Sequence, residues 1–425
     1  MGIGGAGVSA LARVYLARGD EVSGCDANAS ATTAELEDAG VGVEVGHDPE
    51  HVLFQDLIVY SGAIKSSPEL DAARAMGVKV LSRAEALAEL IAESDSIAVG
   101  GSAGKTTVTY MIGHILTEAG LDPTVLVGDG TSSRSGRSGW LVAEVDESDG
   151  SLVLHHPKRA VITNIELDHT DHFKDVEAVR ELFAQFVAGL PADGVAVLCA
   201  DDERAGSLET AARRVTYGFS AHADYRCDEE RPFAIHHQGR ELGRVNLRQA
   251  GRHNVQNATG AAAMALEVGV SFADVAGALE RFPGAHRRLE FIGVFQGASV
   301  YDDYGHHPSK VRATLQAARE LRGRRVIVVF QPHRYSRLTA LMQDFSRAFT
   351  GADKVLVLDV YSAGEDNPTG VQATDLADRL PNGIYVGDFK GARDALENLV
   401  GPGDLLLMMG AGDIRRLGDE LAQRV

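Results

Sequence analysis

Cysteines are scarce in this sequence, as are basic residues and long apolar runs. The chain has 425 residues but only 3 cysteines, Cys25, Cys199 and Cys227, whose odd number and spacing exclude a disulfide framework and a typical zinc motif. No apolar run reaches the roughly 18 residues of a membrane span. With 41 basic and 60 acidic residues, the net charge of −19 argues against general affinity for DNA, RNA or anionic lipid. We expect a reduced, cytoplasmic protein with no nucleic-acid partner and no membrane insertion.

The rest of the composition is that of a folded globular protein. Hydrophobic residues make up 44% of the chain and charged residues 24%. The length suits about three domains. Alternating strand and helix patterns, punctuated by glycine and proline, predict three α/β domains. We place them at residues 1–92, 93–283 and 284–425.

Short apolar runs mark the expected strands, and 3.6-residue periodicity marks the helices. Strands are predicted at residues 21–24, 57–60, 78–81, 96–100, 141–145, 160–163, 195–198, 299–301, 325–330, 354–358 and 405–409. Helices are predicted after Ser82 as far as Glu93, from Val108, and at residues 253–267.

The most informative stretch is a candidate phosphate loop between the apolar run 96–100 and a helical pattern. It consists of Gly101, Ser102, Ala103, Gly104, Lys105, Thr106 and Thr107. Glycines let backbone N–H groups close around phosphate oxygens, the lysine neutralises phosphate charge, and the following hydroxyl can bind Mg²⁺. Val99 stands where the general motif has its first glycine. A chance Gly-Lys-Thr in a surface turn is the alternative, but the strand, loop and helix are all in register.

Two acidic clusters follow expected strands of the same domain. The first lies in the segment 141–149 and includes Glu144, and the second lies in the segment 163–169. Ligands of open α/β sheets bind at the carboxyl ends of strands, so these carboxylates favour cation binding over a solvated loop. Because Mg²⁺ prefers oxygen, His169 indicates a second, softer metal position or a contact through water.

The N-terminus carries a G-x-G-x-x-G pattern at Gly2, Gly4 and Gly7, with Asp26 about where a ribose-binding acid falls in dinucleotide folds. Taken alone, this weak motif favours NAD. Such a glycine turn normally follows a strand, and only Met1 precedes it here. We therefore expect the reading frame to continue upstream with a short apolar strand.

Taken together, these motifs resemble those of the Mur ligases, the ATP-dependent ligases of bacterial cell-wall synthesis. The resemblance runs the whole length of the chain and is carried by the segments 2–5, 102–107, 143–149, 163–169, 253–258, 287–290, 302–308, 330–335 and 410–413. It implies a Rossmann-like N-terminal domain that holds a UDP-sugar, a central ATP-binding domain of the P-loop type with a mostly parallel sheet, and a Rossmann-like C-terminal domain.

The resemblance also implies a reaction. ATP phosphorylates the lactyl carboxylate of UDP-N-acetylmuramate, and the amine of L-alanine attacks the resulting acyl phosphate. ADP, phosphate and an amide are released. Two anions must approach each other in the first step, so cations carry most of the catalysis. Monomers or weak homodimers are expected.

The family pattern implies roles for individual residues. Catalysis is expected from Lys105, Glu144, His169, Arg288 and His306. ATP is expected at residues 101–107 and at Asn254, Asn257, Arg288 and Asp303, with Mg²⁺ on Thr106, Glu144 and His169. UDP-sugar binding is expected from Gly2, Gly4, Gly5, Gly7, Asp26 and Ser61, and amino-acid binding from Tyr304, His306, Arg334 and Arg337. For the two asparagines, helix capping is the structural alternative.

Three other functions are compatible with parts of the sequence. A recycling ligase that attaches an intact murein peptide to the same nucleotide shares most of the motifs. An NAD-dependent oxidoreductase would explain the N-terminal glycines but leaves Lys105 and the acidic clusters without a role. A binding module without activity is disfavoured because every charged catalytic position is filled. Contacts to the sugar nucleotide near Ser132 stay open, because the family often has asparagine there.

Overall fold

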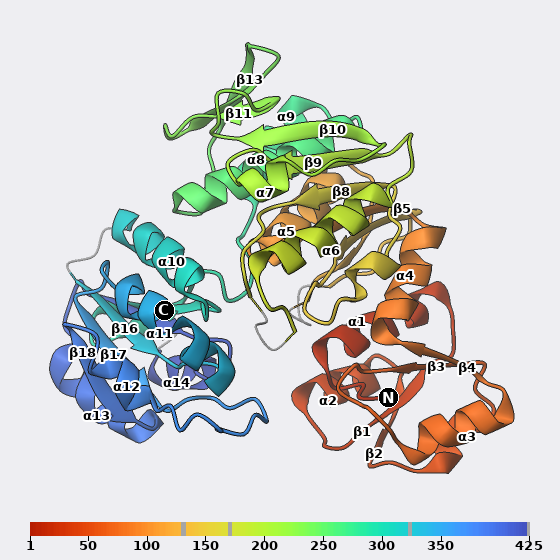
Figure 1. The fold of residues 1–425 in the computed structure, drawn as a ribbon, viewed down its shortest axis with the longest axis horizontal. Coiled ribbons are helices and arrows are strands. Elements are labelled where there is room, and N and C mark those ends of the chain that lie inside the picture. The colour runs from red at the N-terminus through yellow and green to blue at the C-terminus, as the bar shows by residue number, and fades with distance from the viewer. Residues whose placement is uncertain (129–132, 169–171, 322–324, 423–425) are drawn as a thin grey trace. The chain divides into compact units, whose positions relative to one another are not determined.

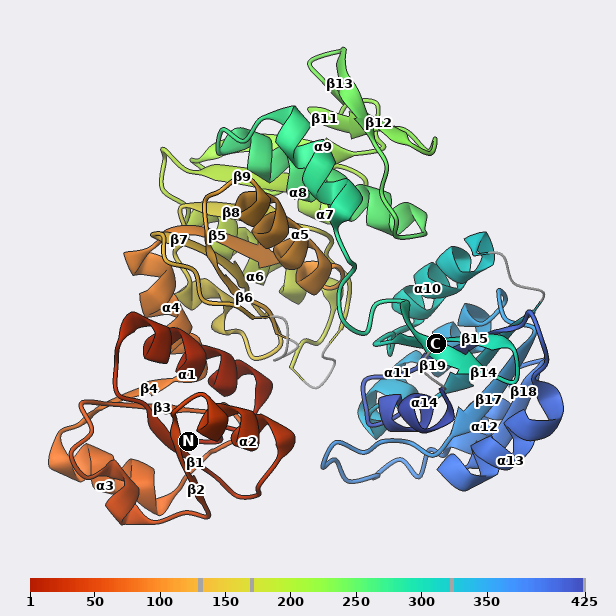
Figure 2. The same cartoon turned by 180° about the vertical axis from the view of Figure 1, so that it is seen from behind.

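The computed structural model describes residues 1–128, 133–168, 172–321 and 325–422. Figures 1 and 2 show the ribbon from opposite sides. Strands alternate with helices over most of the chain, apart from the consecutive strands β10 to β13 (residues 213–245), which confirms the α/β class. Within the described residues, no helix is long and apolar enough to cross a membrane. The chain divides into two compact units, the first of Met1–Glu166, Val176–Asn246 and Asn257–Phe282, the second of Leu167–Asp175, Leu247–Gln256 and Pro283–Val425.

In the N-terminal part of the first unit, two pairs of parallel strands flank the start of the chain. The N-terminal amine of Met1 donates to the carbonyl of Val59 at 2.8 Å, and the N–H of Gly2 donates to the carbonyl of Cys25 at 2.8 Å. The residues before the first helix therefore form hydrogen bonds with both pairs of strands. The elements are α1 (Ala6–Arg18), β1 (Ser23–Asp26), α2 (Ala31–Asp38), β2 (Gly42–Val45), η1 (Pro49–Val52), β3 (Leu57–Tyr60), α3 (Pro68–Met76), β4 (Lys79–Ser82) and α4 (Arg83–Glu93).

The expected cap of α4 is present. The hydroxyl of Ser82 accepts a hydrogen bond from the N–H of Glu85 at 3.2 Å, and the carboxylate of Glu85 accepts from the N–H of Ser82 at 2.7 Å. This capping box satisfies two N–H groups that would otherwise lack partners at the start of the helix. The helix ends at Glu93, as predicted.

The rest of the first unit contains a sheet in the order β13-β12-β11-β10-β9-β8-β5-β7-β6. The pairings from β6 to β11 are parallel, and the pairings of β12 are antiparallel. Figures 1 and 2 show α5 on one face of the parallel region and α6 on the other. The strands are β5 (Asp95–Gly100), β6 (Thr124–Leu126), β7 (Trp140–Glu144), β8 (Arg159–Ile162), β9 (Val195–Cys199), β10 (Arg213–Gly218), β11 (Tyr225–Cys227), β12 (Phe233–His237) and β13 (Arg240–Val245).

The helices that accompany this sheet bury strongly apolar faces. Met111, Ile112 and Ile115 of α5 are each 0% exposed. Such faces follow from the 3.6-residue periodicity of the sequence. The elements are α5 (Lys105–Glu118), η2 (Ser151–Leu154), α6 (Val176–Ala188), α7 (Glu203–Gly206), α8 (Arg252–Glu267) and α9 (Phe272–Arg281).

In the second unit, a sheet in the order β14-β15-β19-β16-β17-β18 separates two apolar cores. All its pairings are parallel except that of β14 with β15. Helices α10, α11 and α12 contribute to one core, and α13 and α14 to the other. The elements are β14 (Glu290–Phe295), β15 (Ala298–Asp303), α10 (Pro308–Glu320), β16 (Val326–Phe330), α11 (Tyr335–Ala348), β17 (Lys354–Leu358), α12 (Ala373–Ala377), β18 (Gly383–Gly387), α13 (Phe389–Leu399), β19 (Leu405–Met409) and α14 (Arg415–Leu421).

Candidate functional site

The candidate phosphate loop follows β5 and leads into α5. Val99 belongs to the buried strand and is 0% exposed, so the loop proper begins at Gly101. Gly101 and Gly104 have φ of 137° and 88°, conformations that favour glycine. A Cβ on Gly101 would lie 2.0 Å from the hydroxyl of Thr163. The two glycines are therefore required by backbone conformation and, at Gly101, by crowding.

A neighbouring strand exit fixes this loop in place. The N–H groups of Ser102 and Ala103 donate to the carbonyl and the side-chain oxygen of Asn164, at 3.0 and 2.9 Å. The hydroxyl of Ser102 donates to the carbonyl of Glu166 and accepts from its N–H. Two loop N–H groups are thus already engaged, and those at the start of α5, from Gly104 onward, point along the helix axis toward the loop.

The acidic cluster after β7 surrounds Lys105. The ammonium lies 2.6 Å from a carboxylate oxygen of Glu147 and 3.8 Å from one of Asp146. Burial opposes the charge on Lys105, but Glu147, Asp146 and Glu144 outweigh it and raise the pKa of the ammonium. Burial also raises the pKa of Glu147, and the ammonium opposes that shift. Lys105 is therefore protonated and positioned at the end of the loop.

Thr106 and Glu144 present oxygen atoms beside Lys105. The hydroxyl of Thr106 donates to both carboxylate oxygens of Glu144, at 3.2 and 3.0 Å, and the N–H of Gly128 donates to one of them at 2.8 Å. A hydroxyl and a carboxylate at this spacing are hard donors of the kind that Mg²⁺ prefers. The third metal ligand implied by the family, His169, lies outside the described residues, as does Ser132.

The glycine turn at the N-terminus gathers the residues that the family assigns to the UDP-sugar. Gly2 has φ of 69°, and a Cβ there would lie 3.0 Å from the side chain of Ser61. The N–H of Gly4 donates to the carboxylate of Asp26 at 2.9 Å. Gly5 precedes α1 as its N-cap. A Cβ on Gly7 would lie 2.4 Å from the Arg83 side chain, so Gly7 serves close packing.

In the second unit, β15 ends at a buried carboxylate. Asp303 is 4% exposed, and its oxygens accept from the N–H groups of Leu289 and Gly305 and from the hydroxyl of Thr314, all at 2.8 to 2.9 Å. Burial raises its pKa, and Arg288 opposes that shift. These three hydrogen bonds within the protein let Asp303 fix the conformation of the loop that follows β15.

That loop carries an aromatic and a neutral imidazole. The guanidinium of Arg288 lies 5.2 Å from the centre of the Tyr304 ring, in a cation–π contact. His306 lies with its Nδ1 2.8 Å from the carbonyl of Tyr304, so Nδ1 carries the proton and Nε2 is an acceptor. Burial, assisted by Lys310 and Arg337, lowers the pKa of His306 well below its usual range.

Arg337, in the first turn of α11, already holds a carboxylate. Its Nε and one terminal nitrogen donate to the same oxygen of Asp168, at 3.2 and 2.8 Å. Lys310 lies 3.5 Å from the other oxygen, and both arginine and aspartate side chains are less than a tenth exposed. Arg334, the N-cap of α11, is 36% exposed and pairs with Glu365 at 3.4 Å. These side chains form a cationic site suited to a carboxylate.

The two asparagines lie near the start of α8, and neither is its N-cap residue, since the helix begins at Arg252. The side chain of Asn254 donates to the carbonyl of Ala250 at 2.6 Å. Asn257 lies against the phosphate loop, because a Cβ on Gly104 would be 2.8 Å from its side-chain oxygen. Both asparagines are 8% exposed.

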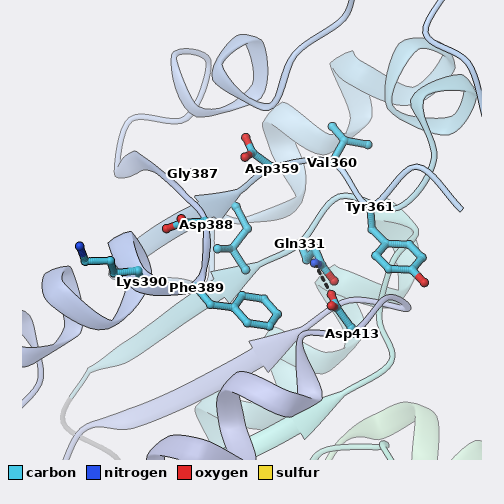
Figure 3. A pocket seen from close by; sticks show the side chains of 10 residues that line it. Gln331, Asp359, Val360, Tyr361, Gly387, Asp388, Phe389, Lys390 and Asp413 are labelled. Carbon is cyan, nitrogen blue, oxygen red and sulfur yellow. Dashed lines mark hydrogen bonds between the residues drawn. The ribbon is translucent and has the colours of Figure 1, made fainter. Parts of the chain in front are cut away.

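A pocket of about 430 Å³ opens at the carboxyl ends of β16, β17 and β18. Figure 3 shows the hydrogen bond between Gln331 and Asp413, with Tyr361 and Phe389 close by. Gln331 and Asp413 belong to segments that carry the family resemblance. The other lining residues are Leu358, Asp359, Val360, Gly387, Asp388 and Lys390.

Three polar residues at these sites are missing from the sequence-based assignments. Glu147 is the closest partner of Lys105, Asn164 anchors the phosphate loop, and Asp168 occupies Arg337. All three lie in segments that the sequence analysis singled out as acidic strand exits. Their place in these segments could have marked them as candidates. The sequence could not show which partner each side chain faces, because that depends on strand register.

Comparison with known proteins covers the whole chain. Residues 1–95, 99–265 and 287–412 match, in order, the profiles "Mur ligase family, catalytic domain", "Mur ligase middle domain" and "Mur ligase, glutamate ligase domain". A UDP-N-acetylmuramate–L-alanine ligase of Desulforapulum autotrophicum is 42% identical, over 100% of this chain and 97% of the relative.

Two solved structures extend this comparison. A UDP-N-acetylmuramate–alanine ligase of Thermotoga maritima superimposes with a TM-score of 0.82 at 27% identity, covering 99% of this chain and 96% of that one. A murein peptide ligase of Psychrobacter arcticus gives a TM-score of 0.70 at 25% identity with the same coverages. With a phosphate loop, a cationic carboxylate site and three family domains in order, the chain belongs to the Mur ligase family.

Proposed function

We propose that this chain is the ligase that joins L-alanine to the lactyl carboxylate of UDP-N-acetylmuramate in peptidoglycan precursor synthesis. ATP is consumed, and ADP and phosphate are released through an acyl-phosphate intermediate. The single observation that carries the proposal is the match, over 100% of the chain at 42% identity, to a ligase of that name. The buried ammonium beside the phosphate loop supports the phosphoryl-transfer half of the reaction.

Phosphoryl transfer is the step we assign to residues 101–107. The N–H groups at the start of α5 bind the phosphates, and Lys105 stabilises the charge that develops on the transferred group. Thr106 and Glu144 would hold Mg²⁺, together with His169 as the family pattern implies. When bound there, Mg²⁺ would neutralise phosphate charge. The ammonium has three N–H donors, so it can stay on Glu147 while it reaches a phosphate oxygen.

We assign the remaining contacts to ATP by the family pattern. Asn254 and Asn257 hold adenine, Asp303 holds the ribose, and Arg288 assists at the phosphates. The position of Asn257 against the phosphate loop supports a role next to ATP. The three donors already on Asp303 leave its carboxylate with limited capacity, so a ribose contact there would use its remaining lone pairs.

The cationic site at the start of α11 is the one we assign to the carboxylate of L-alanine. Arg337 and Arg334 supply the charge, and Tyr304 and His306 lie on the neighbouring loop. The contact of the Asp168 carboxylate with Arg337 and Lys310 supports this assignment, because the carboxylate of an amino acid has the same charge and shape. A neutral His306 with an unprotonated Nε2 is suited to accept a hydrogen bond from the amine of the amino acid.

We assign the UDP-sugar to the N-terminal glycine turn, through Gly2, Gly4, Gly5, Gly7, Asp26 and Ser61. We further propose three domains with the boundaries 1–92, 93–283 and 284–425, a cytoplasmic location and a monomeric or weakly dimeric state. The location is supported by cysteines that form no disulfide within the described residues.

The test is phosphate release from ATP by the purified chain with UDP-N-acetylmuramate and a panel of acceptors. We expect turnover with L-alanine and little with an L-alanyl-γ-D-glutamyl-diaminopimelate peptide, and glycine and L-serine in the same panel measure the selectivity of the site. The peptide is the acceptor of the second candidate function, the recycling ligase. The similarity to the murein peptide ligase, with a TM-score of 0.70, is the reason to test it. Turnover with the peptide but not with L-alanine would replace our proposal by that one.

A further inference from the structure

The N-terminal part of the chain contains a buried cluster of side chains that commonly bind metals, and the proposed reaction uses none of them. Cys25 lies on β1, His51 on η1 and Glu69 in the first turn of α3. Cys25 is 2% exposed and Glu69 is 0% exposed. One ligand atom from each of the three lies within 4.8 Å of the other two. Three elements far apart in sequence therefore bring a thiol, an imidazole and a carboxylate together.

Distances within the cluster are close to those of a tetrahedral site. The Sγ of Cys25 lies 3.7 Å from Oε1 of Glu69, and Nδ1 of His51 lies 3.9 Å from the same oxygen. Bond lengths of about 2.3 Å for zinc to sulfur and 2.0 Å for zinc to nitrogen place ligand atoms roughly 3.3 to 3.6 Å apart. The two distances to Glu69 exceed that spacing by a few tenths of an ångström, and the ligand atoms of Cys25 and His51 lie within 4.8 Å of each other.

Two polar atoms of the cluster lack partners. Neither Nδ1 of His51 nor Oε2 of Glu69 has a hydrogen-bond partner among the described residues, although both atoms are buried. A buried polar atom without a partner is costly, so its presence calls for an explanation. A bound cation would satisfy both atoms at once. An ordinary hydrogen-bonded core would have paired both atoms.

A fourth residue supports the carboxylate from outside. Nδ1 of His47 lies 2.8 Å from Oε1 of Glu69, the same oxygen that faces Cys25 and His51, and holds the carboxylate in place. Carboxylates that bind metals are typically held in this way by a second hydrogen-bonding group. The side chains of His47 and His51 are 36% and 26% exposed, so a metal ion can enter the cluster from their side.

We propose that Cys25, His51 and Glu69 form a binding site for a zinc-class transition-metal ion, with His47 as a positioning residue for Glu69. The mixture of sulfur, nitrogen and oxygen ligands selects Zn²⁺ or Co²⁺ over Mg²⁺, which prefers oxygen alone. The three protein ligands leave a fourth position for water. The ion would link β1, η1 and α3, which also share an apolar core through Cys25, Val52 and Leu70.

Binding a zinc-class ion requires the thiolate of Cys25, so the ion displaces the proton of the thiol. None of the three ligands is assigned to ATP, the amino acid or the UDP-sugar, although Cys25 is next to Asp26 and its carbonyl accepts a hydrogen bond from the N–H of Gly2.

The test is a titration of the full-length chain, first stripped with a chelator, with Co²⁺ and then with Zn²⁺. We expect one equivalent of Co²⁺ to produce a thiolate-to-cobalt charge-transfer band, which Zn²⁺ then abolishes by displacement. This band reports only cobalt bound to sulfur, so cobalt bound near Thr106 and Glu144 does not contribute. Zn²⁺ should also raise the thermal unfolding temperature.

Variants identify the ligands. Cys25→Ser should abolish the charge-transfer band, whereas Cys199→Ser, at another buried cysteine, should keep it. His51→Asn, on the more exposed ligand, should weaken Co²⁺ binding and gives a second test if Cys25→Ser fails to fold. His47→Gln should weaken binding about 10- to 100-fold, the usual effect of losing a supporting partner, without removing the band.

Several results would overturn the proposal. These are Co²⁺ binding without a charge-transfer band, a band that persists in Cys25→Ser, a band lost equally in Cys199→Ser, or unchanged Co²⁺ affinity in His51→Asn. Ligation of L-alanine is measured separately on the same preparations. Loss of that activity with an intact cobalt band would count against the proposed function alone.

Discussion

At the scale of single residues, the clearest feature is a buried lysine held among carboxylates. Lys105 lies 2.6 Å from Glu147 and is 13% exposed in its side chain. Such a charge costs desolvation energy unless it is paired. The pair keeps the ammonium protonated and in place until phosphates arrive.

We predict that Lys105→Ala abolishes phosphate release. Electrostatic contacts of this type contribute on the order of 3 kcal/mol at the transition state, so kcat should fall roughly 100-fold or more. The variant also leaves Glu147 buried without its closest partner, so we pair it with Lys105→Ala/Glu147→Gln, which removes that uncompensated charge. Phosphate release and thermal unfolding are measured for both.

Lys158→Ala serves as the control, because Lys158 is 57% exposed and pairs with Asp95 near the start of β8. It should release phosphate normally. If the folded double variant retained near-normal turnover, Lys105 would have no part in phosphoryl transfer.

Arg334 gives the prediction for substrate recognition. We expect Arg334→Ala to raise the KM for L-alanine about 30-fold, which corresponds to about 2 kcal/mol, the lower end for a charge pair, because the side chain is 36% exposed. ATP affinity should change little. Steady-state kinetics against L-alanine and calorimetric titration of an ATP analogue measure the two quantities.

Arg347→Ala, at an exposed position of the same helix, is the matched control and should leave both quantities unchanged. A loss of nucleotide affinity in Arg334→Ala with an unaltered KM for L-alanine would contradict the prediction. Arg334 would then bind ATP and not the amino acid.

At the scale of elements, the carboxyl ends of three neighbouring strands assemble the central site. Strands β8, β5 and β7 are adjacent and parallel, so the loops that follow them meet at one edge of the sheet. The phosphate loop takes its shape from this edge, through Asn164 and the hydroxyl of Ser102. Backbone conformation at Gly101 is part of the same arrangement.

We predict that Gly101→Ala impairs ATP use far more than Gly120→Ala. Both glycines have positive φ, but a Cβ on Gly101 would lie 2.0 Å from Thr163, whereas one on Gly120, just after α5, would have nothing within 4 Å. Gly120→Ala should cost about 1 kcal/mol of stability with an unchanged KM for ATP. Gly101→Ala should raise that KM or abolish activity.

Urea unfolding and steady-state kinetics separate these two effects. Equal changes in the KM for ATP in both variants would contradict the prediction, because they would point to a general loss of stability and not to an effect on the phosphate loop.

At the scale of the whole molecule, buried histidines couple stability to pH. Burial, assisted by Arg83, lowers the pKa of His155 to about 4, and burial with Arg337 and Arg334 lowers that of His333 to about 4. A histidine with a lowered pKa in the folded chain binds fewer protons there than in the unfolded chain. Its contribution to stability is therefore complete above about pH 6.5 and is lost as the pH falls toward 4.

We predict that His155→Gln flattens the decline in stability between pH 6.5 and 4. In the wild type, the free energy of unfolding falls by on the order of 3 kcal/mol when His155 becomes protonated at low pH, as the shift of its pKa implies. Thermal unfolding of both proteins across this range gives the difference. His222→Gln, at an exposed histidine, is the control and should follow the wild type. Parallel curves for His155→Gln and wild type would contradict the prediction.

Much of this protein was determined by local sequence. The α/β class, the strand–loop–helix arrangement around residues 101–107, the α4 cap and most central strands follow from apolar periodicity, glycine positions and capping residues, which act over a few neighbours. Strands β2, β6, β14 and β18 were not predicted, nor were strands β10 to β13. Three of these last four form an edge whose exposed positions, such as Arg240 and Glu241, interrupt the apolar runs.

Only the tertiary structure decided which side chains meet. Glu147 contacts Lys105, and Asn164 holds the phosphate loop. Asp168 forms an ion pair with Arg337. Cys25 lies next to His51 and Glu69. Sequence spacing excluded a typical zinc motif, but the cluster is built from three elements that lie far apart in the chain. Contacts of this kind depend on strand order and register, and these are fixed by packing across the whole sheet, which no local pattern contains.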